Sequence, residues 1–555
     1  MTPSPELSSP PARAARPVSP VRVFARLKVR LVLNGVRRMT RSNWSKVGFA
    51  FSVLGALCAA ALGFGMAVGL RGFWDPATQH RLLILATSGI VFGWWFGPVL
   101  SGGVDETIDP ARLSLIPLTR TEIRRGQIVA GFIGLSPLMV TTWVVGIVVG
   151  MARSLTVLPL LIVCGVVVLL AALIGSRALS TTLARMSRSR RGGDLAALIA
   201  VIGGSIVFAG LQLARFLTAE QMAAAAGVLR WTPPGMAGEA FELASAGNAV
   251  AASWRIGVLA IVVVIAAWWW SRQLDRLLIE PSSTRGGTLD QSDDELAIFN
   301  GRRRRLPRTP AGAAVARELI YLVRSPGRRA AMLGGTVLGL VYVAFFVAQG
   351  GGDSQWVVLA SPVAMLFALQ YASNQLGVDP GAFWIEVAVG PPASARWVAR
   401  QMLGVIAVLL PVIVAATILA VWSGGWVEFA VVMISMSGAA FSLVGVGSWL
   451  SPLFVTPIPD SGNPFGSRQA MSGTGCSAAI VGMLYLVLVA VLIVPGEVAI
   501  RWSWRSQSPV LTAVIAVATV AANLLVWRVA TSAAVRELSD KELDVLGRLD
   551  PRLNV

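Results

Sequence analysis

The stretch Asp109–Pro137, DPARLSLIPLTRTEIRRGQIVAGFIGLSP, decides how the chain is divided, because it occurs a second time. It opens with Asp-Pro, crosses a short amphipathic segment and enters an apolar run that contains Gln127. The second copy, Asp379–Pro411, also opens with Asp-Pro and places Gln401 in the next apolar run. The Asp-Pro pairs lie 270 residues apart, and the glutamines and final prolines lie 274 apart. We therefore interpret the chain as two related halves, with a small insertion in the second copy.

The composition is typical of a membrane protein. Hydrophobic residues make up 55% of the chain and charged residues 14%, with a mean hydropathy of +0.69, whereas about a quarter of a soluble domain is charged. Uncharged apolar runs of about 20 residues, the length that crosses a bilayer, recur from end to end. We expect an all-α polytopic membrane protein with about twelve transmembrane helices, as two pseudo-repeats of six. The expected spans lie near residues 47–70, 82–104, 127–151, 155–176, 195–214 and 256–271, and near 330–350, 355–377, 401–422, 427–449, 473–496 and 508–527.

The distribution of basic residues predicts the orientation of these spans. The net charge of +19 gathers in alternate loops, and cytoplasmic loops of membrane proteins carry the excess of Lys and Arg. Both termini are therefore expected in the cytoplasm. Because membrane topology explains the positive charge, we expect no nucleic-acid partner. The basic segments are residues 13–46, 112–125, 177–191, 272–329 and 528–552.

The same patterns divide the chain into segments. Before the first span of each half, basic and apolar residues alternate at helical spacing, which predicts an amphipathic helix along the cytoplasmic membrane surface. A simple basic anchor next to the membrane is the alternative. The expected segments are a disordered tail 1–20, a first half 21–280 with its surface helix 21–45, a cytoplasmic linker 281–310, a second half 311–535 with its surface helix 311–329, and a cytoplasmic tail 536–555.

The loop between the second and third spans of each half has the composition of a docking surface. An apolar patch with a charged rim is typical of surfaces that bind another protein. A solvated loop that only follows the charge rule is the alternative. The candidate docking residues are Leu113, Leu115, Ile116, Leu118, Arg120, Glu122, Arg124 and Arg125 in the first half, and Ile385, Glu386 and Arg396 in the second.

Residues for catalysis or ion binding are scarce. The lysines are Lys28, Lys46 and Lys541, and none follows the Gly-rich turn of a phosphate-binding loop. HExxH and GxSxG motifs are absent as well. We therefore expect no enzymatic activity, catalytic residue, metal or cofactor in this chain. Ion-coupled carriers place ionisable residues inside their spans, whereas we expect Glu497 outside the membrane and the single histidine, His80, in a solvated outer loop.

Three short motifs resemble the membrane subunit of ATP-binding-cassette exporters of the ABC-2 type. LSLIPLTRTEIRRGQIVAG at Leu113–Gly131 is similar to that family's cytoplasmic loop leading into its third helix. RELIYLVRSPGRR at Arg317–Arg329 is similar to the helix before its first span, and WTPPGMAGEAF at Trp231–Phe241 to its outer loop before the sixth helix. The fused form is similar to actinobacterial permeases of the tetronasin and multidrug exporter kind. The second copy departs at Val387–Pro392, VAVGPP, which is less charged than its counterpart.

This resemblance implies transport powered from outside the chain. It implies export of a hydrophobic or amphipathic compound, such as a drug, an antibiotic or a lipid-like molecule, across the bacterial plasma (inner) membrane. Two copies of a cytoplasmic ATPase subunit would bind the ATP and Mg²⁺. A twelve-span ion-coupled carrier and a non-transporting scaffold for an ATPase are the alternatives. Candidates for the substrate cleft, with lipid or packing contacts as the other interpretation, are Phe92, Trp95, Phe96, Phe367, Tyr371 and Asn374.

Overall fold

The computed structural model describes most of the chain, and all regular structure in the described residues is helical. The described residues are 20–39, 43–100, 118–186, 190–213, 217–279, 299, 301–324, 326–350, 357, 372–377, 383–455, 475–505 and 508–549. The expected disordered tail, most of the linker 281–310 and most of the span expected at 355–377 lie outside them.

The N-terminal part of the chain forms one helix group. Its helices are α1 (Pro20–Met39), α2 (Asn43–Phe73), α3 (Pro76–Leu100), α5 (Arg120–Gly131), α6 (Leu135–Met151), α7 (Leu158–Met186), α8 (Arg190–Leu213), α9 (Ala219–Leu229), α10 (Pro233–Ser245) and α11 (Ala249–Ile279).

The C-terminal part forms a second helix group, preceded by the 3-10 turn η3 (Gly301–Arg305). Its helices are α12 (Pro310–Arg324), α13 (Pro326–Gly350), α16 (Phe383–Val389), α17 (Ala393–Ser423), α18 (Trp426–Leu453), α19 (Gly475–Arg505), α20 (Pro509–Asp540) and α21 (Glu542–Leu549).

Seven helices among the described residues are long and apolar enough to cross a membrane. They support an all-helical membrane protein but do not by themselves give twelve spans. Two further apolar helices, Pro137–Met151 and Met332–Phe345, are shorter. The seven candidate spans are Val53–Leu70, Leu158–Met186, Ala249–Arg276, Ala393–Ser423, Trp426–Leu453, Gly482–Trp504 and Val510–Asp540.

The second surface helix is shorter than the sequence predicts. Instead of reaching residue 329, α12 ends at Arg324, and the long helix α13 begins at Pro326. Proline favours the first turn of a helix because it has no N–H to leave unpaired there. Residues 326–329 therefore belong to the long helix.

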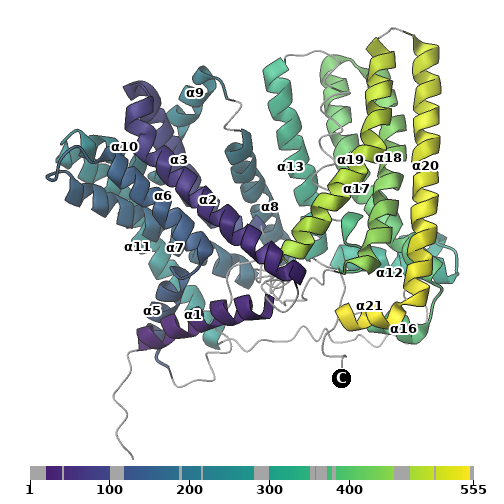
Figure 1. Cartoon of the computed structure of the whole chain (residues 1–555), viewed down its shortest axis with the longest axis horizontal. Helices are drawn as coiled ribbons and strands as arrows, with labels where there is room; N and C mark the ends of the chain where they lie inside the picture. The colour runs from purple at the N-terminus through teal and green to yellow at the C-terminus, as the bar shows by residue number, and fades with distance from the viewer. Residues whose placement is uncertain are drawn as a thin grey trace, which may run out of the picture.

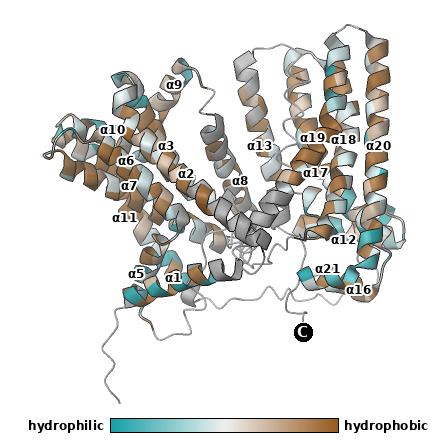
Figure 2. Ribbon diagram, viewed as in Figure 1, coloured by the Kyte–Doolittle hydropathy of each residue, from teal (hydrophilic) through white to brown (hydrophobic). Residues whose placement is uncertain are grey.

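The two groups stand beside each other with their amphipathic helices at the same end (Figure 1). Helices α1 and α5 lie at the bottom of the first group in this view, and α16 and α21 lie at the bottom of the second. Hydrophobic residues predominate along the long helices, while hydrophilic residues are frequent on α1, α5 and α21 (Figure 2). This is the distribution expected of helices that lie along a membrane surface beneath spanning helices.

The contacts between the groups are reciprocal. The first long helix of the second group, α13, packs against α8, and the first long helix of the first group, α2, packs against α19. Both α8 and α19 are the last long helix but one in their groups. In both directions, the first long helix of one group contacts the last long helix but one of the other. A two-fold relation between two similar units produces this pattern.

Small residues allow close packing inside the second group. A Cβ atom at Gly438 would lie 3.1 Å from the backbone of Val520, and one at Gly445 would lie 2.9 Å from the backbone of Trp527. Both contacts join α18 to α20, whose backbones therefore lie close together, as in tightly packed membrane helices.

Candidate functional site

The candidate site consists of two junctions at the same end of the molecule. The first junction is formed by α1, α5 and the C-terminal end of α11, and the second by α12, α16, the start of α17, and α21. In each junction a surface helix contacts the helix that continues the repeated Asp-Pro stretch, because α1 packs on α5 and α12 packs on α17.

A capping box fixes the start of α5. The Thr119 hydroxyl accepts a hydrogen bond from the Glu122 backbone N–H at 3.3 Å, and the Glu122 carboxylate accepts one from the Thr119 N–H at 2.8 Å. This arrangement satisfies two N–H groups that an open helix end would leave unpaired. The hydrogen bonds from Thr119 lower the pKa of Glu122. The predicted docking residue Glu122 thus also shapes the helix that carries it.

An apolar contact fastens α1 to α5. Phe24 is buried, and a Cβ atom at Gly126 would lie 2.4 Å from its ring. Phe24 shares an apolar cluster with Ile123 of α5 and with Trp270 and Leu274 of α11. The three helices of the first junction therefore meet around one aromatic side chain.

Half-exposed ion pairs add to this contact. The Arg124 guanidinium lies 3.1 Å from the Asp275 carboxylate of α11, and Arg120 lies 4.0 Å from the same group. Arg124 thereby helps to hold α5 on α11, whereas Arg120 and Arg125 are exposed. Leu118 packs against the apolar cluster. The candidates Leu113, Leu115 and Ile116 lie outside the described residues.

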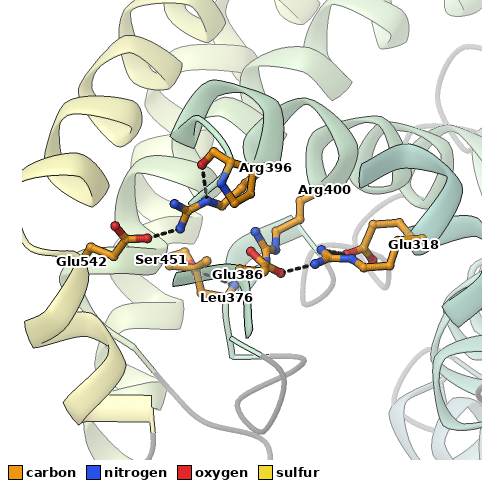
Figure 3. Close-up of polar contacts among 9 residues, drawn as sticks. Glu318, Leu376, Glu386, Arg396, Arg400, Ser451 and Glu542 are labelled. Atoms are coloured by element: carbon orange, nitrogen blue, oxygen red, sulfur yellow. Dashed lines mark hydrogen bonds and ion pairs between the residues drawn. The ribbon is translucent and has the colours of Figure 1, made fainter. Parts of the chain in front are cut away.

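Buried charges fasten the second junction (Figure 3). The Glu386 carboxylate of α16 lies 2.6 Å from Arg317 of α12 and 2.6 Å from Arg400 of α17. Glu318 also pairs with Arg317, at 2.8 Å. Burial disfavours the charged form of Arg317, but Glu386 and Glu318 outweigh it and raise the pKa of the guanidinium. One carboxylate thus joins three helices.

A second buried arginine joins α17 to α21. Arg396 pairs with Glu542, and its Nε donates a hydrogen bond to the Pro391 carbonyl at 3.0 Å (Figure 3). Val545 of α21 lies in an apolar cluster with Trp397 and other buried side chains. The expected cytoplasmic tail 536–555 therefore begins as part of α20 and then folds back as α21 onto the second junction.

This geometry corrects the roles predicted for two docking candidates. Glu386 and Arg396 are each only 5% exposed, so they position helices instead of presenting charge at a surface. Ile385 is exposed, as predicted for a docking residue, together with Trp384 and Val389. Sequence reasoning missed the partners of the buried charges because they come from helices far apart in the chain.

The proposed cleft residues that the structure describes make packing contacts. Trp95 donates a hydrogen bond from Nε1 to the Ala171 carbonyl at 2.8 Å, and it meets Phe92 edge to face with ring centroids 5.6 Å apart. Phe96 lies against Gly203 of α8. These three residues lie together on α3. The Asn374 side chain accepts a hydrogen bond from the Gly377 N–H within a turn, and Phe367 and Tyr371 lie outside the described residues.

The glutamine of the repeated stretch is buried in both groups. Gln127 and Gln401 are each nearly inaccessible to solvent. Gln401 donates hydrogen bonds to Ser448 of α18 and to Thr531 of α20, each at 2.9 Å, and accepts one from Trp527 at 3.1 Å. Gln401 is thus the centre of a polar network among three helices.

The environments of Glu497 and His80 differ from those that the sequence predicts. Glu497 is buried within α19, which continues through Pro495 and past residue 496, where the sequence predicts that the span ends. Proline is tolerated in membrane helices when neighbours satisfy the freed backbone groups. His80 is half-buried beside Glu239 and Glu242, so it is not a simply solvated residue.

Groups of metal-ligating side chains large enough to hold an ion are absent from the part of the chain that the structure describes. In the comparisons with known proteins, no family model, curated protein or solved structure matches the chain.

Proposed function

We propose that the chain is the membrane permease of an ATP-binding-cassette exporter of the ABC-2 type. In this proposal it moves a hydrophobic or amphipathic compound across the bacterial plasma membrane. It crosses the membrane about twelve times as two six-helix halves, with both termini in the cytoplasm. Two cytoplasmic ATPase subunits bind ATP and Mg²⁺ and supply the energy.

The repeated junction is the observation that carries the proposal. Each helix group bears an amphipathic helix packed on the helix that carries the repeated glutamine, at the same end of the molecule (Figure 1). Each junction also has an arginine bound to an acidic residue of its group's last helices, Arg124 to Asp275 and Arg396 to Glu542. Two similar junctions could each bind one of a pair of similar ATPase subunits.

The fastening of each junction supports a mechanical role. A displacement of α5 is transmitted to α1 through Phe24 and to α11 through Asp275. A displacement of α16 is transmitted to α12 and α17 through Glu386. In the proposal, closure of the ATPase pair moves both junctions. The groups then rock at their mutual contacts, α8 on α13 and α2 on α19.

The exposed Arg125 of α5 offers the sharpest test. Glu122, Arg124 and Arg120 also hold α5 itself, so Arg125→Glu is the cleaner change. After copurification of the ATPase from native membranes, we expect this variant to lower stimulation of ATP hydrolysis roughly three- to tenfold. The matched control is Arg153→Glu, which reverses the charge of another exposed residue, in the turn after α6. Uphill transport by the pure chain, without any ATPase, would refute the proposal.

Glu497 favours one alternative, an ion-coupled carrier. Its carboxylate is buried within a candidate span, accepts a hydrogen bond from Ser435 of α18 and lies near Arg501. Ionisable groups at such positions often serve ion binding or relay. In the carrier alternative, an uncoupler abolishes uphill transport and Glu497→Gln reproduces the loss. In the exporter proposal, ATP sustains transport by this variant in the presence of the uncoupler.

A further inference from the structure

Helix α10 lies directly on the backbone of α3, at the end of the first group opposite the junctions (Figure 1). A Cβ atom at Gly238 would lie 2.7 Å from the backbone of Leu83 and Ile84. On the same face of α10, Ala237 and Phe241 are fully buried. The Thr232 hydroxyl caps the helix start by accepting a hydrogen bond from the Gly235 N–H. α10 is therefore a well-formed helix in close contact with the bundle.

A buried carboxylate helps to hold α10 in place. Glu239 is 3% exposed and pairs with Arg230, which ends α9, at 3.0 Å, and with Arg255 of α11. A carboxylate out of water is stable only when it is paired in this way. Glu239 thus joins α10 to its neighbours on two sides, independently of α3.

The contact between α10 and α3 includes the imidazole of His80. His80 of α3 contacts the Glu242 carboxylate through Nδ1, and its Nε2 lies 3.8 Å from Glu239. Both His80 and Glu242 are about one-third exposed, so protons from the solvent reach them. Among the described residues, the His80 ring is the partner of the Glu242 carboxylate. His80 is also the only histidine of the chain.

The charged groups Arg230, Arg255 and Asp75 around His80 have partners of their own. Arg230 and Arg255 face it across Glu239, with which both pair. Asp75, near the start of α3, accepts hydrogen bonds from the Thr78 hydroxyl and from the Thr78 N–H, which lower the pKa of its carboxyl. Arg81 is the next residue along the chain. Glu242 is therefore the carboxylate that remains to pair with His80.

We propose that His80 and Glu242 form a proton-dependent latch that fastens α10 to α3. A protonated imidazole donates from both nitrogens and so binds Glu242 and faces Glu239 favourably. A neutral imidazole has one N–H, so its other nitrogen presents a lone pair to a carboxylate. The latch is therefore tight on the acid side and loosens as rising pH removes the proton. The assignment of this end to the outer side of the membrane rests on the proposed function, whereas the latch itself does not.

Hydrogen exchange of the α10 amides tests the latch on the full chain in nanodiscs, without ATPase or cargo. After correction for intrinsic exchange, opening of α10 is expected to be about two- to fivefold less frequent at acid than at alkaline pH, the scale of a half-exposed ion pair. His80→Gln and Glu242→Gln should each abolish this pH dependence. Glu220→Gln, an exposed change on neighbouring α9, should retain it. The same pH dependence in the wild type and in His80→Gln would overturn the proposal.

The single histidine allows a second, independent test by NMR of its ring protons. In protein labelled only at histidine, NMR should show at acid pH one imidazolium whose Nδ1 proton has the downfield shift of a bond to a carboxylate. Glu242→Gln should remove that shift while leaving the α10 amides protected through Glu239. An unshifted Nδ1 proton in the wild type would contradict the contact. Neither measurement depends on transport, so a failed latch and a failed exporter proposal are distinguishable.

Discussion

The two junctions perform the same architectural task with different chemistry. In the first, Phe24 fits against Gly126 and a half-exposed Arg124–Asp275 pair adds to the contact. In the second, the buried Glu386 carboxylate pairs with the buried Arg400 and with the partly exposed Arg317. An apolar contact tolerates the loss of a neighbouring charge, but a buried ion network does not, because the remaining charges stay unpaired. The difference predicts that the second junction depends more strongly on single residues.

The largest effect is expected from Glu386→Gln. It leaves the buried Arg400 without its carboxylate, a change that typically costs about 3–5 kcal/mol, while Arg317 keeps its pair with Glu318. We expect α16 and the start of α17 to lose that much local opening free energy, measured by hydrogen exchange. Asp275→Asn is the matched change in the first junction and should cost far less. Equal losses at both junctions would remove the contrast between them.

The next largest effect is expected at the aromatic contact of the first junction. Phe24→Ala should destabilise the α1–α5 contact by about 3 kcal/mol, the usual cost of removing a buried phenyl ring. Gly126→Leu should also destabilise it, because the added side chain meets the ring. In the double variant, the leucine occupies the space that the ring leaves. A double-mutant cycle should therefore show strong favourable coupling, and additive losses would argue against direct packing.

The contrast between the junctions also shows which parts of the fold can be predicted from the sequence. The composition and the apolar runs predict the all-helical membrane class, and the alternation of arginines with apolar residues predicts the surface helices, because both signals are local. The meeting of Arg317, Glu386 and Arg400 is not local, since it depends on how three helices pack. Nor could the surroundings of His80 be derived, because Glu239 and Glu242 approach it from about 160 residues away. The span expected to end near residue 496 continues to Arg505, because proline interrupts membrane helices less strictly than soluble ones.

A smaller effect is expected from the half-exposed pair of the first junction. Arg124→Ala should weaken the α5–α11 contact by at most about 1 kcal/mol, because solvent screens the pair. The effect should shrink further at high salt, which hydrogen exchange of α5 at two ionic strengths would reveal. Arg396→Ala, in the second junction, should cost more and show little salt dependence, because its pair with Glu542 is largely buried. Strong salt dependence at Arg396 would contradict the buried character of that junction.

The smallest effect concerns the helix starts and their response to pH. The hydrogen bonds from Thr119 hold the pKa of Glu122 below its ordinary value of 4.5, so the cap contributes fully above that value and is lost as the pH falls through the lowered one. The start of α5 should therefore fray at acid pH, seen as faster amide exchange after intrinsic correction. Thr119→Val should weaken the dependence, because only the hydrogen bond from the backbone N–H remains, and Thr119→Ser should keep it. The start of α17 is capped by Pro392 without a side-chain hydrogen bond, so its exchange should not follow this titration. Acid fraying of both helices alike would mean that the cap is not what distinguishes them.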